Sequence, residues 1–419
     1  MKKHYWISLW ILVELLIVTG TTHAIPAFAR KYGFNCNMCH TSFTKLNDFG
    51  QRYRDNGYQN QGQEGKENTV FSTPPPIAMR TSTGISMYKN SSGSAAGFNL
   101  FGLDLLASGV LHKNVSFMLI YTPRIDEPAA DHTGSDNGRN PSQLAALESA
   151  NLVFSNLVKD ALNLRIGRFE PAYHAFSSKR SYYLFSPYDV YGFTTPLNSY
   201  SFDDNQIGIE ATGHFRSGFK YGVGFVNGTG ANPDNNKNKD LYFNLFQTFG
   251  RGDGQSAGQR IGVFGYYGWQ PMNIDSIFLS PTGETNGKDN KSFYRVGLNG
   301  SFNWKTWNLG LLWMKGVDDK AFNMHTPAEN YAYTGWLVEL DYAALMNNRL
   351  VASILLNRIN PPEYDAEGQV NAISGLLRHY LGDWSAVNVS IHAEYTHRTI
   401  GKTQKTTDNL FALLLDFAF

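Results

Sequence analysis

From residue 77 to its last residue, the chain alternates apolar and polar side chains in sixteen short segments. Apolar residues occupy every second position from Val387 to Tyr395 and again from Phe219 to Phe225. Period two is typical of strands with one apolar and one polar face. The pattern predicts an all-β fold with strands at 77–88, 97–111, 114–124, 147–158, 161–169, 205–215, 218–227, 240–250, 259–268, 291–303, 305–315, 332–344, 348–358, 368–380, 385–398 and 406–419.

The connections between these segments are alternately short and long. Short connections include 112–114 and 159–160, and long ones include 125–146, 170–204 and 270–290. Outer-membrane barrels have short periplasmic turns, long extracellular loops and an even number of strands. We therefore predict a 16-stranded antiparallel β-barrel over residues 77–419, in contact with the lipid of a bacterial outer membrane, with all long connections outside.

The composition agrees with a β-rich chain that faces lipid. Charged residues make up 17% of the chain, against about 25% in soluble domains. A soluble sandwich or a propeller also has short strands, but neither explains the alternating connection lengths. The 36 Lys and Arg residues nearly cancel the 35 Asp and Glu residues, so no basic surface for nucleic acid is expected.

The N-terminus has the features of a secretory signal. Lys2 and Lys3 precede an apolar run from Tyr5 to Val18, and small residues follow up to Ala24. This order predicts a signal peptide over residues 1–24, although a cut after Ala29 also fits the small-residue rule. The run is too short and too interrupted for a membrane-spanning helix.

The two cysteines of the chain, Cys36 and Cys39, are followed directly by His40. Cys-x-x-Cys-His is the pattern of c-type haem attachment, in which two thioethers hold the porphyrin and the histidine is the proximal iron ligand. A zinc site would need a second ligand pair, and a thioredoxin-like pair would need a βαβ unit. We expect one covalent haem c on a cytochrome segment over residues 25–76.

This segment is too small to shield a haem alone, so we expect it to lie inside the lumen. Between residues 25 and 78 the only histidine is His40 and the only methionine is Met38. Met38 lies inside the attachment loop and cannot reach the opposite face of the ring. The distal position is therefore open, water-bound, filled by a weaker ligand or supplied from beyond residue 78. His392 is near mid-strand on the inward face, and we take it as a hypothetical distal ligand.

The N-terminal segment resembles the fused cytochrome–porin family, which includes the outer-membrane ferrous-iron oxidases of iron-oxidising bacteria. The resemblance rests on Ile25-Pro26-Ala27-Phe28-Ala29-Arg30, Gly33, Cys36-x-x-Cys39-His40, Leu46-Asn47-x-Phe49-Gly50 and Gly57-Tyr58, with Thr44 in place of the expected proline. It implies one haem on Cys36 and Cys39, with His40 as ligand, joined to a sixteen-stranded barrel.

A haem and a barrel in one chain predict an electron conduit across the outer membrane. The expected extracellular donor is Fe(II), the expected acceptor is a periplasmic c-type cytochrome, and the corresponding activity is that of an Fe(II):cytochrome c oxidoreductase. Two alternatives stay open: a solute-diffusion porin whose haem segment gates or senses, and a conduit for another donor or acceptor. Acidic residues in the long connections have the oxygen ligands that a hard cation prefers: Asp126, Glu127, Asp203, Asp204, Glu363, Asp365 and Glu367.

Overall fold

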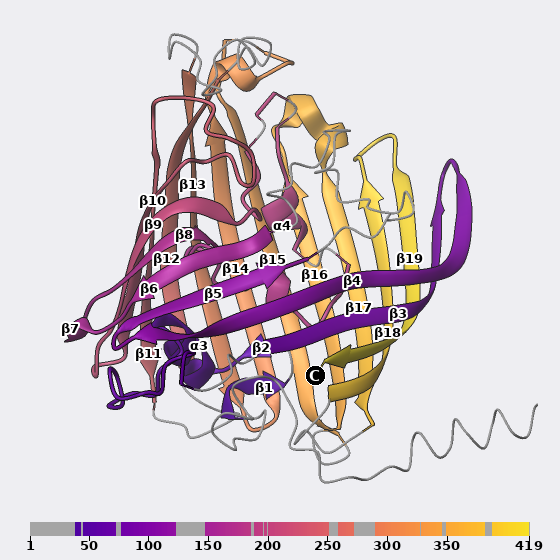
Figure 1. Ribbon diagram of the computed structural model, residues 1–419. Helices are drawn as coiled ribbons and strands as arrows, with labels where there is room; N and C mark the ends of the chain where they lie inside the picture. The colour runs from indigo at the N-terminus through magenta and orange to yellow at the C-terminus, as the bar shows by residue number, and fades with distance from the viewer. Residues whose placement is uncertain are drawn as a thin grey trace, which may run out of the picture.

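Sixteen antiparallel strands close into a barrel, in which the first barrel strand pairs with the last (Figure 1). The computed structural model describes residues 38–42, 45–72, 77–122, 147–185, 188–195, 197–198, 200–250, 259–271, 290–326, 328–345, 349–381 and 388–418. The barrel strands are β3 (Ile77–Asn90), β4 (Gly93–His112), β5 (Val115–Tyr121), β6 (Leu147–Phe154), β8 (Asn163–Phe169), β9 (Gln206–His214), β10 (Phe219–Val226), β11 (Asp240–Phe249), β12 (Gln259–Pro271), β13 (Asn290–Trp304), β14 (Trp307–Asp318), β15 (Tyr331–Leu345), β16 (Leu350–Asn360), β17 (Val370–Tyr380), β18 (Asn388–Ile400) and β19 (Thr406–Ala418).

Shorter elements precede or interrupt these strands. The N-terminal segment contains β1 (His40–Ser42), β2 (Lys45–Leu46) and α3 (Asp48–Asp55), and the connections contain β7 (Leu157–Asp160), α4 (Asp189–Gly192) and single 3₁₀ turns at Ser178–Arg180, Lys320–Phe322 and Glu363–Gly368. Among the described residues, no helix is long and apolar enough to cross a bilayer.

Each predicted strand corresponds to one barrel strand, so the predicted fold class and strand number are confirmed. The ends differ by a few residues. β14 continues past the predicted end at 315, because Val317 and Asp318 still pair with Tyr294 and Phe293 of β13. The predicted signal peptide, 1–24, and Cys36 lie outside the described residues.

The two faces of each strand meet different surroundings. Tyr266 and Tyr267 are neighbours on β12, and their exposed fractions are 2% and 42%. The outer face is apolar, whereas inner charges form pairs such as Arg295–Asp318 at 2.7 Å and Arg378–Asp416 at 3.0 Å. Buried charges are stable only when they are paired in this way.

The connection between β8 and β9 corrects one expectation from the sequence. We expected residues 170–204 outside the barrel, but the described residues of this connection turn inward and cross the lumen (Figure 1). The hydroxyl of Tyr183 donates to Ser353 of β16, and that of Tyr188 donates to Glu339 of β15. The physical reason is the six tyrosines and four phenylalanines of this connection, whose burial is favourable.

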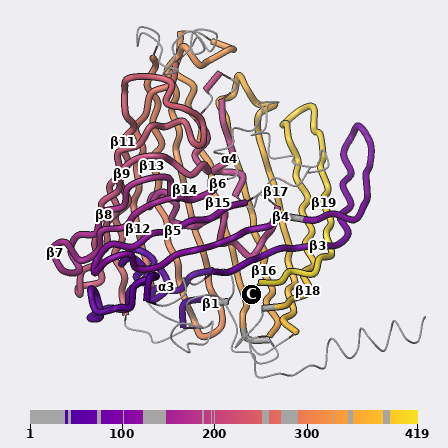
Figure 2. Tube along the Cα trace, viewed as in Figure 1, coloured from indigo at the N-terminus to yellow at the C-terminus, as the bar shows by residue number. Residues whose placement is uncertain are grey.

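The barrel has one end where the strands are joined by short turns. The described part of the N-terminal segment lies at this end. In Figures 1 and 2, α3 and β1 are at the lower end of the barrel. α3 contacts His214 and Lys220, which flank the short turn between β9 and β10. Because short turns are periplasmic in this class of barrel, the segment docks at the periplasmic end.

Candidate functional site

The residues after the Cys-x-x-Cys-His motif hold its second half against α3. Asn47 donates its backbone N–H to the carbonyl oxygen of Cys39 at 2.9 Å and its side-chain amide to that of Met38 at 3.0 Å. The Asn47 side-chain oxygen accepts the N–H of Gly50 and so caps α3. One asparagine therefore holds both the loop that contains Met38 and Cys39 and the start of the helix.

Gly50 lies where a larger side chain would collide with this loop. A Cβ at this position would lie 2.2 Å from the carbonyl oxygen of Cys39 and 3.0 Å from Cδ2 of Leu46. The Leu46-Asn47-x-Phe49-Gly50 motif thus has a local role: it packs the loop that carries Cys39 and His40 closely against α3.

Ion pairs attach α3 to the barrel wall. The Asp55 carboxylate lies 3.1 Å from Arg165 on β8 and 3.1 Å from His214 on β9, while Lys220 on β10 donates to Asp48. Lys45, just before the helix, lies 2.5 Å from Asp341 and 3.3 Å from Glu339 on β15. The segment is thus held from opposite sides of the lumen.

The rest of the segment follows the wall toward β4. Gln59 is fully buried, and its side-chain amide donates to Ser155 Oγ at 3.1 Å. The backbone N–H of Val70 donates to the carbonyl of Val110 on β4 at 2.9 Å. These contacts place residues 59–70 along the short-turn end of the wall, whereas α3 and Lys45 contact inward-facing side chains of the lumen. The position of a haem segment inside the lumen stays a prediction, because Cys36 lies outside the described residues.

Burial and cations act in opposite directions on two carboxyl groups at this junction. Burial works to raise the pKa of Asp55, but Arg54, His214 and Arg165 together hold it well below its ordinary value. Burial also opposes ionisation of Glu170, yet Arg180, His174 and Arg54 lower its pKa to about 2. Both carboxylates are therefore ionised partners of the surrounding cations at neutral pH.

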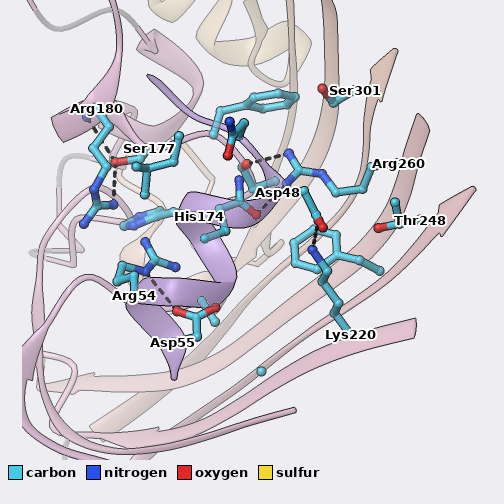
Figure 3. Close-up of a pocket in the computed structure, with 18 of the residues that line it drawn as sticks. Asp48, Arg54, Asp55, His174, Ser177, Arg180, Lys220, Thr248, Arg260 and Ser301 are labelled. Atoms are coloured by element: carbon cyan, nitrogen blue, oxygen red, sulfur yellow. Dashed lines mark hydrogen bonds and ion pairs between the residues drawn. The ribbon is translucent and has the colours of Figure 1, made fainter. Parts of the chain in front are cut away.

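A cavity of about 120 Å³ lies between α3, the inward connection and the barrel wall (Figure 3). Its lining is rich in cations and polar groups. Five of the lining residues are lysines or arginines, Lys45, Arg54, Arg180, Lys220 and Arg260, and two are carboxylates, Asp48 and Asp55.

The size and the lining of this cavity test whether the residues fit a haem. Pockets that bury a drug-sized molecule measure roughly 300–1,000 Å³, so this cavity admits an edge of a porphyrin and not the whole ring. Leu46 and Asn47 line it and also hold the loop that carries Cys39. Cys39 and His40 do not line the cavity, but Asn47, which does, binds the carbonyl oxygen of Cys39. The lysines and arginines of the lining are the groups that the carboxylates of a porphyrin would need.

The structure does not favour His392 as a distal iron ligand. Its side chain is fully buried on the inward face, as expected, but Nδ1 lies 3.0 Å from Nη2 of Arg378 and Nε2 lies 2.8 Å from Oε2 of Glu394. Both ring nitrogens are thus already bound. Strand parity correctly predicted the direction of the side chain, but it could not predict these partners.

The aromatic side chains of the inward connection were missed as functional residues. Tyr173, Tyr191, Tyr200 and Phe202 are almost fully buried and pack against wall residues such as Tyr266. The ring centroids of Tyr173 and Phe202 are 4.4 Å apart, and those of Tyr200 and Tyr266 are 4.6 Å apart. The density of aromatic residues between 170 and 204 is the sequence signal that could have identified this lumen packing.

The acidic residues of the long connections do not form a metal site among the described residues. Asp365 accepts the hydroxyl of Tyr331 at 2.5 Å, and Glu367 accepts the backbone N–H groups of Thr403 and Gln404. Asp203 accepts from Ser178, while Asp126 and Glu127 lie outside the described residues. Where it is described, the chain contains no group of three or more His, Cys, Asp or Glu side chains that could hold a metal ion.

Comparison with known proteins identifies the architecture. No protein-family model matches this sequence, and no curated protein sequence does. Solved structures match over most of the chain. An anion-selective porin from Comamonas acidovorans is 11% identical, with 82% of this chain and all of that chain covered and a TM-score of 0.53. OprB from Pseudomonas putida is 14% identical, with 84% and 95% covered and a TM-score of 0.54.

OmpF from Salmonella typhi, in complex with daunomycin, is 10% identical, with 82% and 97% covered and a TM-score of 0.52. The fold is that of a bacterial outer-membrane porin. Together with the apolar outer face of the strands, this porin-like fold places the chain in the bacterial outer membrane, where it contacts lipid.

Proposed function

We propose that this porin-like barrel is an electron conduit of the outer membrane. It carries one haem c, bound to Cys36 and Cys39 with His40 as the proximal ligand. An extracellular donor, with Fe(II) as the leading candidate, gives up one electron, and a periplasmic c-type cytochrome takes up one. With Fe(II) as donor, the reaction is that of an Fe(II):cytochrome c oxidoreductase, in which Fe(II) becomes Fe(III).

The observation that carries the proposal is the position of the segment that follows the Cys-x-x-Cys-His motif. It docks inside the periplasmic end of the lumen, through the pairs of Asp55 with Arg165 and of Asp48 with Lys220. Diffusion of solutes through a barrel does not require a segment of this kind in the lumen. A haem held there would lie within reach of a periplasmic partner.

The residues of this chain have clear roles in the proposal. The haem, when bound, supplies the one-electron chemistry. Asn47 and Gly50 hold the attachment loop on α3, and the ion pairs hold α3 on the wall. The inward connection packs aromatic side chains into the lumen above this segment and keeps water out of their core.

A second candidate is a solute-diffusion porin with a haem segment that gates or senses. The solved structures to which the fold is similar are porins, and one is anion-selective. This comparison favours the second candidate. The packed aromatic core between strands on opposite sides of the lumen favours the first.

Proteoliposomes separate the two candidates. The haem-loaded protein is reconstituted around a sealed, oxidised soluble c-type cytochrome, and Fe(II) is added outside without oxygen. We expect the enclosed cytochrome to be reduced, and we expect no reduction with the Cys36→Ser/Cys39→Ser variant. An enclosed cytochrome that stays oxidised, together with open-channel conductance of the same protein in a planar bilayer, would favour the porin.

A further inference from the structure

We infer that the cavity beside α3 contains a binding subsite for a carboxylate or phosphate group, centred on Arg260 of β12. The inference deepens the proposed function and partly rests on it, because the propionate carboxylates of the haem are one source of such a group. A free anion from the periplasm is the other source.

Arg260 differs from the other cations that line the cavity. Lys45, Arg54, Arg180 and Lys220 each have a carboxylate within 4 Å. Arg260 has only neutral oxygen partners within the described chain: Oε1 of Gln51 at 3.0 Å and the carbonyl oxygen of Ala175 at 3.2 Å.

The Nε of Arg260 is buried without a hydrogen-bond partner in the described part of the chain. Asp48 also lines the cavity and attracts Arg260 electrostatically, but its carboxylate is bound to Lys220. A partly buried guanidinium that has no counter-charge of its own is unfavourable. The planar guanidinium also matches the geometry of carboxylate and phosphate oxygens. The cavity therefore holds one positive group that a bound anion would complete.

The strand register places hydroxyl groups on both sides of Arg260. Thr248 of β11 and Ser301 of β13 lie directly opposite Arg260 in its two ladders. Directly opposed residues have Cβ atoms about 4.5–5.5 Å apart. All three residues line the cavity, and Figure 3 shows them on the same side of α3 together with Lys220.

The two hydroxyl groups are available as donors. The Thr248 hydroxyl is buried without a hydrogen-bond partner in the described residues. The Ser301 hydroxyl accepts from the side-chain amide of Asn308 at 3.0 Å and so keeps its own proton to donate. A guanidinium between two hydroxyl donors is the arrangement expected for a group with two or three acceptor oxygens.

The subsite is linked to the attachment loop by contacts along α3. Arg260 binds Gln51, the backbone N–H of Gln51 donates to Asn47, and Asn47 donates to the carbonyl of Cys39. A haem attached to Cys39 would therefore have its ring next to the helix that contacts Arg260. The cavity admits one edge of the ring, and the propionate edge is the anionic one.

The first experiment removes the haem as a source of carboxylates. Full-length Cys36→Ser/Cys39→Ser protein is titrated with inorganic phosphate by calorimetry. We expect saturable binding, weakened tenfold or more by Arg260→Gln, because a charge-assisted contact of this kind is lost. Arg358→Gln, which removes an exposed arginine that binds Asn360 on β16, should leave the affinity unchanged.

The second experiment uses the haem-loaded protein. If propionate is bound, phosphate should no longer bind, and Arg260→Gln should lower the midpoint potential while Arg358→Gln does not, because a nearby positive charge favours the reduced iron. Phosphate binding that persists with haem present supports the subsite and assigns it to a free anion.

Further variants keep the test decisive if Arg260→Gln fails to fold, which heat-modifiability on gels reports. Thr248→Val/Ser301→Ala retains the arginine and should also weaken phosphate binding. Equal phosphate affinity in the parent and in these variants, or no phosphate binding at all with an unshifted potential, would overturn the subsite. A chain without covalent haem by pyridine haemochrome assay would refute the proposed function and leave the phosphate titration valid.

Discussion

Nη2 of Arg165, on the barrel wall, lies 3.1 Å from Oδ1 of Asp55, the last residue of α3. The contact joins two parts of the chain that are 110 residues apart in sequence. Asp55 also contacts Arg54 and His214, so one carboxylate is shared by two arginines and a histidine at the junction. Asp55 is therefore a main contact of α3 with the wall, beside the pairs that Asp48 and Lys45 make.

We therefore predict that Asp55→Ala releases the segment. Removal of one partner from a buried ion pair costs about 3–5 kcal/mol. Here the loss weakens the docking of α3 on the barrel wall. Hydrogen exchange measured by mass spectrometry should show faster exchange across residues 45–72 while the barrel strands stay protected. Glu64→Gln is the matched control, since Glu64 binds only Asn56 within the described segment. Unchanged protection in Asp55→Ala would contradict the assigned role.

Docking should also weaken in acid. The pKa of Glu170 is lowered to about 2 against burial by Arg180, His174 and Arg54, and that of Asp55 is lowered well below its ordinary value. Both carboxyl groups have a lower pKa in the docked state than in the unfolded chain, where the pKa is about 4. The docked state is therefore stabilised above about pH 4, and this stability is lost as the pH falls through the docked-state pKa values.

Hydrogen exchange of residues 45–72 should accordingly be constant from pH 7 to pH 5, after correction for the intrinsic exchange rate. Protection should fall between about pH 4 and pH 2. Asp55→Asn should show weaker protection already at pH 7 and a smaller further loss in acid, because one of the titrating groups is absent. Loss of protection centred near pH 6 would instead indicate that histidine protonation releases the segment.

If the chain carries haem as proposed, Gly50→Ala should disturb haem attachment. The added Cβ would lie 2.2 Å from the Cys39 carbonyl oxygen, which is backbone and cannot turn away. The attachment loop must therefore move off α3. We expect less haem per protein by pyridine haemochrome assay, whereas Gly97→Ala, which meets nothing within 4 Å, should load normally. Full loading of Gly50→Ala would show that attachment does not depend on this close approach.

The sequence predicted the barrel well because the alternation of apolar and polar residues shows which face of each strand contacts lipid. Val387 to Tyr395 alternates without error, and β18 lies where this pattern predicts it. The pattern contains no information about partners across the lumen. His392 was therefore placed correctly on the inward face, but its contacts with Arg378 and Glu394 became visible only in the structure.

The inward connection was missed for a different reason. A long connection in this class of barrel is extracellular by default, and only side-chain burial decides otherwise. The carboxylate of Asp318 binds Thr195 and Asn198 of this connection at 2.8 and 3.1 Å, as well as Arg295 of β13. The aromatic density of the connection indicates that it is buried, but its individual partners depend on the closed barrel, so no local pattern predicts which residues it contacts.

The packed lumen predicts a low conductance for the intact protein in a planar bilayer. Tyr266 faces this packing, and its hydroxyl donates to Asp240 at 2.5 Å, whereas the neighbouring Tyr267 faces lipid. Tyr266→Ala should create a cavity that costs about 3–5 kcal/mol and should loosen the inward connection, so that conductance rises. Tyr267→Ala removes the same side chain from the outer face and should leave conductance unchanged. A high conductance of the wild-type protein, equal in both variants, would indicate an open pore, in which the aromatic packing does not limit the passage of ions.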